Sequence, residues 1–368
     1  MRQFSLMKAA LFCTARYMGP APRDVWPAPG DSYSSEVAEH SMQTTLQQFG
    51  LADEFGFDWV TVAEHHFSPL SLTPNPMVMA GALTQIVRKA KIAVLGPTVP
   101  ILNPVRVAEE FAMLDTMSGG RVIAGMMRGT PNEYVTYNID PHESRERFQE
   151  ALALIRMTWT EERPFGWQGK HYEYRAISIW PRPVQKPHPP IYMSGSSLES
   201  GEFAARSHVG LGLAFTNVPQ AKKAVAHYRA QADEAGWNPG PDDVIYRVNV
   251  HVADTDEQAL EDVRSGPARV SLSMANKPLE RAVAEAGYYG RDTDAQRGRL
   301  APRDIEERVA IGQLLVGSPA TVVKQIKSIR DELGAGVLDL TLAVQLGERT
   351  LHAIELLGRK VIPQIREL

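Results

Sequence analysis

The sequence Phe57-Asp58-Trp59-Val60-Thr61-Val62 runs directly into Ala63-Glu64-His65-His66-Phe67. Its first part is rich in aromatic and β-branched residues, which predicts a buried strand. A carboxylate and two imidazoles follow at once, and burying three ionisable groups in an apolar core is unfavourable. We therefore expect Glu64, His65 and His66 at the end of a strand, facing a cleft. Histidines of a surface loop or of a hydrogen-bonded core are the alternative. Adjacent histidines on a strand point to opposite faces, so the segment lacks the spacing of a zinc site and no metal is expected.

Strands alternate with helices along the rest of the chain. Apolar runs predict eight strands, near residues 9, 59, 92, 122, 191, 211, 245 and 338, each followed by a helix or a helix-bearing segment. This alternation is typical of a parallel sheet in an α/β protein. Eight units in one domain favour a TIM (β/α)8 barrel, and a doubly wound open sheet is the alternative. No G-x-G-x-x-G motif follows the first strand, which weakens the dinucleotide-binding alternative.

Two segments interrupt the alternation. Residues 164–174 predict a short hairpin, and residues 266–304, with many charges and glycines, predict an inserted region between the seventh and eighth strands. Residues 15–33 predict a long loop and 41–55 a helix, and 348–366 are expected to form the last helix. No break is polar enough for a linker, so residues 1–368 are expected to form a single domain.

The composition is that of an ordinary globular protein, with 43% hydrophobic and 22% charged residues. A net charge of −4 points to neither nucleic acid nor an anionic membrane as partner. The chain has no run of about 18 apolar residues and no signal-peptide pattern. Its one cysteine, Cys13, lies in an apolar run and fits a reducing, cytoplasmic location.

The loops after the strands hold the functional groups of a TIM barrel. After the predicted fifth strand, Gly195-Ser196-Ser197 leads into a helix that contains Ser200, and a helix start binds anions through its free N–H groups. Arg128 follows the fourth strand and offers a bidentate fork for phosphate. Each signal alone is weak, because Gly-Ser-Ser is also a common capping sequence. Together they are typical of a site for a phosphorylated ligand, with Met127 as a candidate wall for an aromatic ring.

The stretch from Phe57 to Phe67 resembles the signature of bacterial luciferase and its relatives, the luciferase-like flavin-dependent monooxygenases. Further matches follow in the same order and span most of the chain: Asn75-Pro76, Pro104 to Glu110, Leu114 to Arg121, Met127 to Gly129, Pro187 to Tyr192 and Val316 to Val322. The resemblance implies a TIM barrel with an inserted region. It also implies a two-component enzyme in which reduced FMN, delivered by a separate NAD(P)H:flavin reductase, reacts with O₂ to give a flavin C4a-(hydro)peroxide that oxygenates a small organic substrate.

The resemblance also implies roles for single residues. His65 falls at the active-site histidine beside the flavin ring, and Glu64 is expected to orient it. The phosphate-binding positions of the family fall on Arg128, Ser196, Ser197 and Ser200. The positions expected against the flavin ring are Leu95, Gly96, Met127 and Phe215, with a cis peptide bond between Leu95 and Gly96, a conformation that costs about 3 kcal/mol outside proline.

The chain departs from luciferase at several positions. Met127 replaces a reactive cysteine, so no thiol chemistry is expected there. Ser196 replaces a glutamate, and losing a carboxylate beside a phosphate should not weaken FMN binding. The loop 15–33 also differs, which predicts a different substrate pocket.

Hydroxylation and Baeyer–Villiger insertion remain open as the chemistry. An oxidoreductase using the deazaflavin F420 is the first alternative, but relatives of that kind generally lack Glu-His-His-Phe. A non-catalytic flavin-binding partner subunit is the second, and the presence of His65 argues against it. The family resemblance implies a homodimer.

Overall fold

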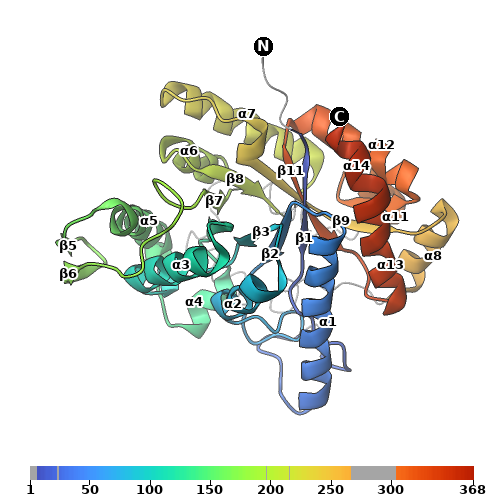
Figure 1. Ribbon diagram of the computed structural model, residues 1–368, viewed down its shortest axis with the longest axis horizontal. Helices are drawn as coiled ribbons and strands as arrows, with labels where there is room; N and C mark the ends of the chain where they lie inside the picture. The colour runs from blue at the N-terminus through green and yellow to red at the C-terminus, as the bar shows by residue number, and fades with distance from the viewer. Residues whose placement is uncertain (1–5, 23–24, 196, 215, 267–303) are drawn as a thin grey trace.

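The computed structural model describes residues 6–22, 25–195, 197–214, 216–266 and 304–368. Its centre is a closed barrel of eight parallel strands surrounded by helices, as Figure 1 shows. The strands follow one another around the barrel as β1 (Lys8–Phe12), β2 (Trp59–Val62), β3 (Lys91–Val94), β4 (Val122–Met126), β7 (Ile191–Ser194), β8 (Gly210–Leu213), β9 (Val244–Val252) and β11 (Val337–Leu342). The predicted TIM barrel is therefore confirmed.

Helices cover the outside of the barrel. They are α1 (Ser35–Glu54), α2 (Pro76–Ile86), α3 (Pro104–Ser118), α4 (Pro131–Thr136), α5 (Ser144–Thr160), α6 (Leu198–Arg206), α7 (Val218–Glu234), α8 (Asp256–Ser265), α11 (Ile305–Ala310), α12 (Pro319–Leu333), α13 (Glu348–Leu356) and α14 (Ile362–Arg366). A π-helical turn, Leu357–Val361, joins α13 to α14, so the predicted last helix runs without a gap. The apolar faces of helices and strands form one large core between them.

A second core fills the inside of the barrel. Side chains of alternate residues point inward along each strand, and Ala10, Trp59, Ala93, Ile123 and Ile245 belong to this cluster. Because the strands are parallel, their carboxyl ends meet at one rim of the barrel. The loops that follow the strands therefore gather at this rim, where TIM barrels carry their sites.

The elements depart from the expected pattern in three places. α1 begins at Ser35 and not at residue 41, because the Ser34 side chain caps the helix by accepting a hydrogen bond from the N–H of Val37. The segment after Gln313 is a strand, β10 (Leu314–Gly317), which pairs with the far end of β9. α4 was not expected.

Of the two segments predicted to interrupt the alternation, the structure describes one. The hairpin is confirmed as β5 (Phe165–Gln168) and β6 (Glu173–Ile177), which pair antiparallel. The predicted insertion 266–304 lies almost entirely outside the described residues.

Candidate active site

Glu64 and His66 form a buried pair directly after β2. Each is 6% exposed, and Oε1 of Glu64 lies 3.3 Å from Nε2 of His66. The other carboxylate oxygen accepts a hydrogen bond from the backbone N–H of Thr98, 3.4 Å away, in the loop after β3. Residues two apart in an extended chain share a face, so Glu64 meets His66 and not His65. Glu64 therefore links the loops after β2 and β3. It was expected to orient His65, but it contacts His66.

His65 points the other way, toward α4. Its Nδ1 lies 3.5 Å from Oε1 of Glu133, whose side chain is only 2% exposed. This separation is an ion-pair distance and too long for a good hydrogen bond. His65 Nδ1 is itself buried, and it makes no hydrogen bond to any part of the chain that the structure describes.

Glu133 is held by the start of its own helix. The backbone N–H of Thr130 donates to Oε2 of Glu133 over 2.6 Å, and the Thr130 hydroxyl donates to the same oxygen. Burial alone raises the pKa of the Glu133 carboxyl, but the nearby His65 imidazole and the hydrogen bonds from Thr130 outweigh burial and hold that pKa below its usual range. The sequence Thr130-Pro131-Asn132-Glu133 is a capping box. This signal marks the helix start in the sequence, whereas the contact with His65 leaves no mark there.

Aromatic side chains enclose His66. The Tyr137 hydroxyl lies 3.4 Å from His66 Nδ1, and the two ring centroids are 5.1 Å apart at an interplanar angle of 78°. Nε1 of Trp26 donates to the His66 carbonyl over 3.1 Å. Burial, with the negative charges of Glu64 and Glu133, raises the pKa of the Tyr137 phenol. His66 is therefore held in place by its neighbours, whereas the buried Nδ1 of His65 has no hydrogen bond among the described residues.

Gly96 lies where the backbone after β2 leaves no room for a side chain. A Cβ on Gly96 would sit 2.7 Å from both Ala63 Cα and Glu64 N. The predicted cis bond between Leu95 and Gly96 is wrong, because every cis bond of the described residues precedes a proline. The close approach to Ala63 accounts for a glycine at this position with the lower-energy trans bond.

Met127 and Arg128 lie on a loop that is pinned to its neighbour. Val99 N donates to the Met127 carbonyl over 3.0 Å, and Met127 N donates to the Pro97 carbonyl over 3.2 Å. Met127 packs against the barrel interior. Nη1 of Arg128 donates to Oγ of Ser144, 3.4 Å away, in the first turn of α5.

α6 begins directly after β7, as the sequence predicts. Ser197 caps the helix: its Oγ accepts from the Ser200 N–H over 3.3 Å and lies 2.9 Å from the Ser200 hydroxyl. The N–H groups of Leu198 and Glu199 have no partner within the helix, and the helix dipole places partial positive charge there. Serine hydroxyls and N–H groups thus converge at this point of the rim.

The Arg128 side chain and the start of α6 meet the same turn of α5. Arg128 contacts Ser144, and the next residue, Arg145, forms an ion pair of 2.7 Å with Glu199 of α6. The loop that carries Arg128 and the start of α6 are thus each linked to the first turn of α5, through Ser144 and Arg145. Two other predicted site residues lie outside the described residues: Ser196 and Phe215.

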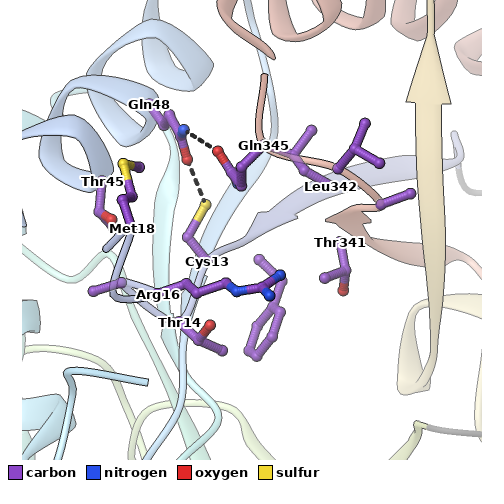
Figure 2. A pocket seen from close by; sticks show the side chains of 13 residues that line it. Cys13, Thr14, Arg16, Met18, Thr45, Gln48, Thr341, Leu342 and Gln345 are labelled. Atoms are coloured by element: carbon purple, nitrogen blue, oxygen red, sulfur yellow. Dashed lines mark hydrogen bonds between the residues drawn. The ribbon is translucent and has the colours of Figure 1, made fainter. Parts of the chain in front are cut away.

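A small pocket opens on the opposite side of the rim, between the ends of β1 and β11 (Figure 2). It holds about 460 Å³ of empty space, including its opening to solvent. Arg16, in the loop after β1, is the only charged residue among the thirteen that line it. No composition or motif marks this residue as functional.

No group of three or more His, Cys, Asp or Glu side chains within the described ranges is arranged to hold a metal ion. No helix in those ranges is both long and apolar enough to cross a membrane.

A barrel with histidines, an arginine and a helix start gathered at its carboxyl rim has the organisation of a TIM-barrel enzyme. The particular family follows from the sequence, which matches the luciferase-like monooxygenases over residues 24–336. The chain belongs to this family.

Curated relatives agree with the assignment. The alkanal monooxygenase alpha chain of Photorhabdus luminescens is 30% identical over 191 residues, which are 50% of this chain and 52% of the relative. The oxygenase component of a flavin-dependent trigonelline monooxygenase from Acinetobacter baylyi is 23% identical over 57% of this chain and 59% of its own length. Limonene 1,2-monooxygenase of Rhodococcus erythropolis is 25% identical over 89% of this chain and 82% of its own. For the first two of these relatives, the match spans only a little over half of the relative's length.

Solved structures share the fold over almost the whole chain. A monooxygenase from Streptomyces bottropensis is 26% identical, with a TM-score of 0.76 and coverage of 97% of this chain and 99% of its own. The oxygenating constituent of 3,6-diketocamphane monooxygenase from Pseudomonas putida, solved with FMN, has a TM-score of 0.76 at 21% identity, covering 97% of this chain and 98% of its own. An F420-dependent secondary alcohol dehydrogenase has a TM-score of 0.70 at 19% identity, covering 98% and 99%. At the last two identities the likeness shows the fold alone. The named relatives and neighbours are mainly monooxygenases.

Proposed function

We propose that this chain is the oxygenase component of a two-component monooxygenase that uses reduced FMN and O₂ to oxygenate a small organic substrate. The observation that carries the proposal is that Arg128 and the start of α6 both contact the first turn of α5, Arg128 through Ser144 and Glu199 through Arg145, while His65 contacts α4, the helix that follows the Arg128 loop. A phosphate group needs such donors and a helix start. Bound reduced flavin supplies the activation of O₂, a chemistry that protein side chains do not provide.

The phosphate end of FMN is assigned to the start of α6. Ser197 and Ser200 offer hydroxyls, the helix offers the N–H groups of Leu198 and Glu199, and Arg128 offers its guanidinium. Ser196 is assigned to the same end and Phe215 to the ring end, on the family resemblance alone.

The ring end of FMN is assigned to Leu95, Gly96 and Met127. Gly96 brings the loop after β3 against the backbone of Ala63 and Glu64, and Met127 adds a polarisable wall. His65 lies on the neighbouring loop after β2, within reach of a ring placed on Gly96, because Gly96 touches the backbone of Ala63 and Glu64.

His65 is assigned the role of holding or moving a proton beside the flavin. The Glu133 carboxylate, 3.5 Å from Nδ1, favours a proton on that nitrogen and leaves Nε2 as the basic one. Glu64 is assigned a positioning role, because it holds the loops after β2 and β3 together through His66 and Thr98. Glu133 was missed from the sequence, and the structure makes it the nearest acidic partner of His65.

The proposal includes a separate NAD(P)H:flavin reductase as partner and a homodimer as the assembly. Relatives named as alpha chain, beta chain and oxygenase component support a multi-component system. The choice between hydroxylation and Baeyer–Villiger insertion follows from the substrate.

The decisive experiment is an anaerobic titration of the protein with reduced FMN, followed by mixing with O₂. We expect reduced FMN to bind, Arg128→Gln to weaken its binding by about tenfold or more, and Arg175→Gln, an exposed arginine on β6, to leave it unchanged. Binding of reduced F420 in preference to reduced FMN would support the F420 alternative.

The reaction with O₂ separates the remaining alternatives. Bound reduced FMN that reacts no differently from free reduced FMN would favour the non-catalytic partner subunit. An oxygenase is expected instead to consume a substrate with O₂, and His65→Ala should abolish product formation while reduced FMN still binds.

A further inference from the structure

Helix α4 supplies a side chain to each of the two neighbouring histidines after β2. Glu133, in its first turn, faces His65, and Tyr137, the residue that ends the helix, faces His66. The Tyr137 N–H donates to the Glu133 carbonyl over 3.0 Å, so the last turn fixes the backbone of Tyr137. Four residues are about one turn of helix. The Tyr137 phenol therefore lies about one turn from the acidic partner of His65.

Three polar side chains, Glu64, His66 and Tyr137, form a row that leads from the interior to the rim. Oε1 of Glu64 lies 3.3 Å from Nε2 of His66, and Nδ1 of the same ring lies 3.4 Å from the Tyr137 hydroxyl. Glu64 and His66 are each 6% exposed, whereas Tyr137 is 44% exposed. Both distances are long for hydrogen bonds, as those between acid–base groups often are before a substrate binds. This polar row has a buried carboxylate at one end and an accessible phenol at the other.

Glu64 determines where the His66 ring keeps its proton. A carboxylate only accepts hydrogen bonds, so Glu64 favours the tautomer with hydrogen on Nε2 and leaves Nδ1 as an acceptor for the phenol. When the imidazole takes up a second proton, Nδ1 becomes the donor, and the phenol hydrogen can turn toward another acceptor. The direction of the hydrogen bond between His66 and Tyr137 therefore follows the charge of the imidazole.

The Tyr137 hydroxyl keeps its proton at neutral pH. Burial, together with the negative charges of Glu64 and Glu133, raises the pKa of the phenol. Among the residues that the structure describes, His66 Nδ1 is the one hydrogen-bond partner of this hydroxyl. A phenol both donates and accepts hydrogen bonds, so the hydroxyl retains the capacity to bond a molecule at the rim. The two carboxylates disfavour an anion at this place.

The neighbour on the other side of His66 is aromatic. The Phe67 ring lies 6.3 Å from the His66 ring and 6.3 Å from the Trp26 ring, and Phe67 is 55% exposed. Its φ of 53° is a left-handed conformation, which is unfavourable for a bulky residue; strained residues of this kind cluster at active sites. The hydrogen bond from Ala28 N to the Phe67 carbonyl, 3.0 Å, supports this turn. An uncharged, largely apolar molecule suits such surroundings.

We propose that Tyr137 is a catalytic residue whose hydroxyl contacts the substrate, with His66 and Glu64 as positioning residues, and that the substrate is an uncharged compound with an oxygen that accepts this hydrogen bond. When the substrate oxygen takes the phenol proton, the imidazolium of His66 replaces it from Nδ1. One O–H bond forms on the substrate, one N–H bond of His66 breaks, and the imidazolium becomes neutral. Calling the bound molecule the substrate rests on the proposed function, whereas the polar row does not.

The first test needs no cofactor. Nitrogen NMR of the protein with isotope-labelled histidine reports which ring nitrogen of His66 carries the proton. At about pH 8, where an ordinary imidazole is neutral, we expect the proton on Nε2 and a hydrogen-bonded Nδ1. Tyr137→Phe keeps the ring, and in this variant the Nδ1 signal should move to that of an unbonded nitrogen. Tyr33→Phe, at an exposed tyrosine whose ring stacks on Tyr17, is the matched control and should leave the signal unchanged.

The second test uses probes of the proposed substrate class. Cyclohexanone, methylenecyclohexane, which has the same shape without the oxygen, and cyclohexanecarboxylate are titrated by calorimetry without O₂. The titrations use the protein alone and the protein with reduced FMN. We expect the ketone to bind about three- to tenfold more tightly than the alkene and more tightly than the carboxylate. Tyr137→Phe should abolish the preference for ketone over alkene, and Tyr33→Phe should keep it.

The outcomes separate this inference from the proposed function. If reduced FMN fails to bind, the proposed function falls, while the Nδ1 signal of the protein alone still decides whether the polar row exists. A proton on Nδ1 of neutral His66, or the same Nδ1 signal in the wild type and in folded Tyr137→Phe, would overturn the row. A ketone preference that survives in Tyr137→Phe, or none in the wild type, would overturn the substrate contact even if reduced FMN binds.

Discussion

His65 and Glu133 face each other between the loops after β2 and β4, with Nδ1 of the histidine 3.5 Å from Oε1 of the glutamate. The glutamate is almost fully buried and is fixed by the capping box at the start of α4. A histidine whose orientation depends on a buried carboxylate has a defined ring position and a preferred tautomer. The contact with Glu133 therefore determines the ring orientation of His65 at the rim.

The Glu133 carboxylate should make stability depend on pH. Its pKa in the folded protein lies below the ordinary value of 4.5. The stabilisation is therefore fully present above about pH 4.5 and is lost as the pH falls through the folded-state pKa. Glu133→Gln should reduce the free energy of unfolding by about 1–3 kcal/mol at pH 7. That difference should shrink on acidification below pH 4.5, as measured by urea unfolding at several pH values. A difference that does not change with pH would contradict this role.

The two neighbouring histidines should behave differently when replaced. His66→Ala removes the imidazole partner of buried Glu64, and we expect a loss of about 2–4 kcal/mol in the free energy of unfolding. His65→Ala should cost less, about 1 kcal/mol, because Glu133 keeps its hydrogen bonds from Thr130 when the imidazole is removed. Under the proposed function, His65→Ala should instead lose product formation. Unfolding in urea and turnover assays on both variants test the contrast, and equal losses of stability would argue against it.

Gly96 should not tolerate a side chain. In Gly96→Ala the new Cβ would lie 2.7 Å from backbone atoms of Ala63 and Glu64, which cannot move aside as a flexible side chain would. We expect a loss of about 1–3 kcal/mol in stability and weaker binding of reduced FMN. Gly81→Ala is the matched control, because a Cβ at Gly81 of α2 meets nothing within 4 Å. That change should raise stability by about 0.5–1 kcal/mol, since alanine is the better helix former. Urea unfolding of the two variants tests whether the free energy of unfolding falls in Gly96→Ala and rises in Gly81→Ala.

Ser197 should combine a structural role with a binding role. Ser197→Ala removes the cap of α6 and should reduce stability by about 1 kcal/mol. Ser34→Ala removes the comparable cap of α1, which lies away from the assigned FMN residues, and should cost a similar amount. Only Ser197→Ala should also weaken the binding of reduced FMN, by about tenfold. Equal FMN affinity in the two variants would remove Ser197 from the proposed phosphate site.

The sequence alone determined the barrel and its rim. Strands such as Trp59–Val62 and Val122–Met126 are read from local apolar runs, and the helix start after Gly195-Ser196-Ser197 follows from capping chemistry, because both signals depend only on near neighbours in the chain. The ordered motifs around Glu64, His65 and Arg128 were enough to identify the family that the matched sequence model confirms.

The partners of these residues were decided by tertiary structure alone. Side-chain alternation after β2 places Glu64 beside His66. The packing of α4 against the rim places Glu133 beside His65. The bond before Gly96 is trans, and a close contact with the backbone of Ala63, which the sequence does not show, accounts for the glycine. The pocket of Arg16 and Thr341 joins residues 325 positions apart, a placement that only the closure of β11 against β1 produces. Local chemistry fixes elements, whereas contacts between distant segments depend on how those elements pack.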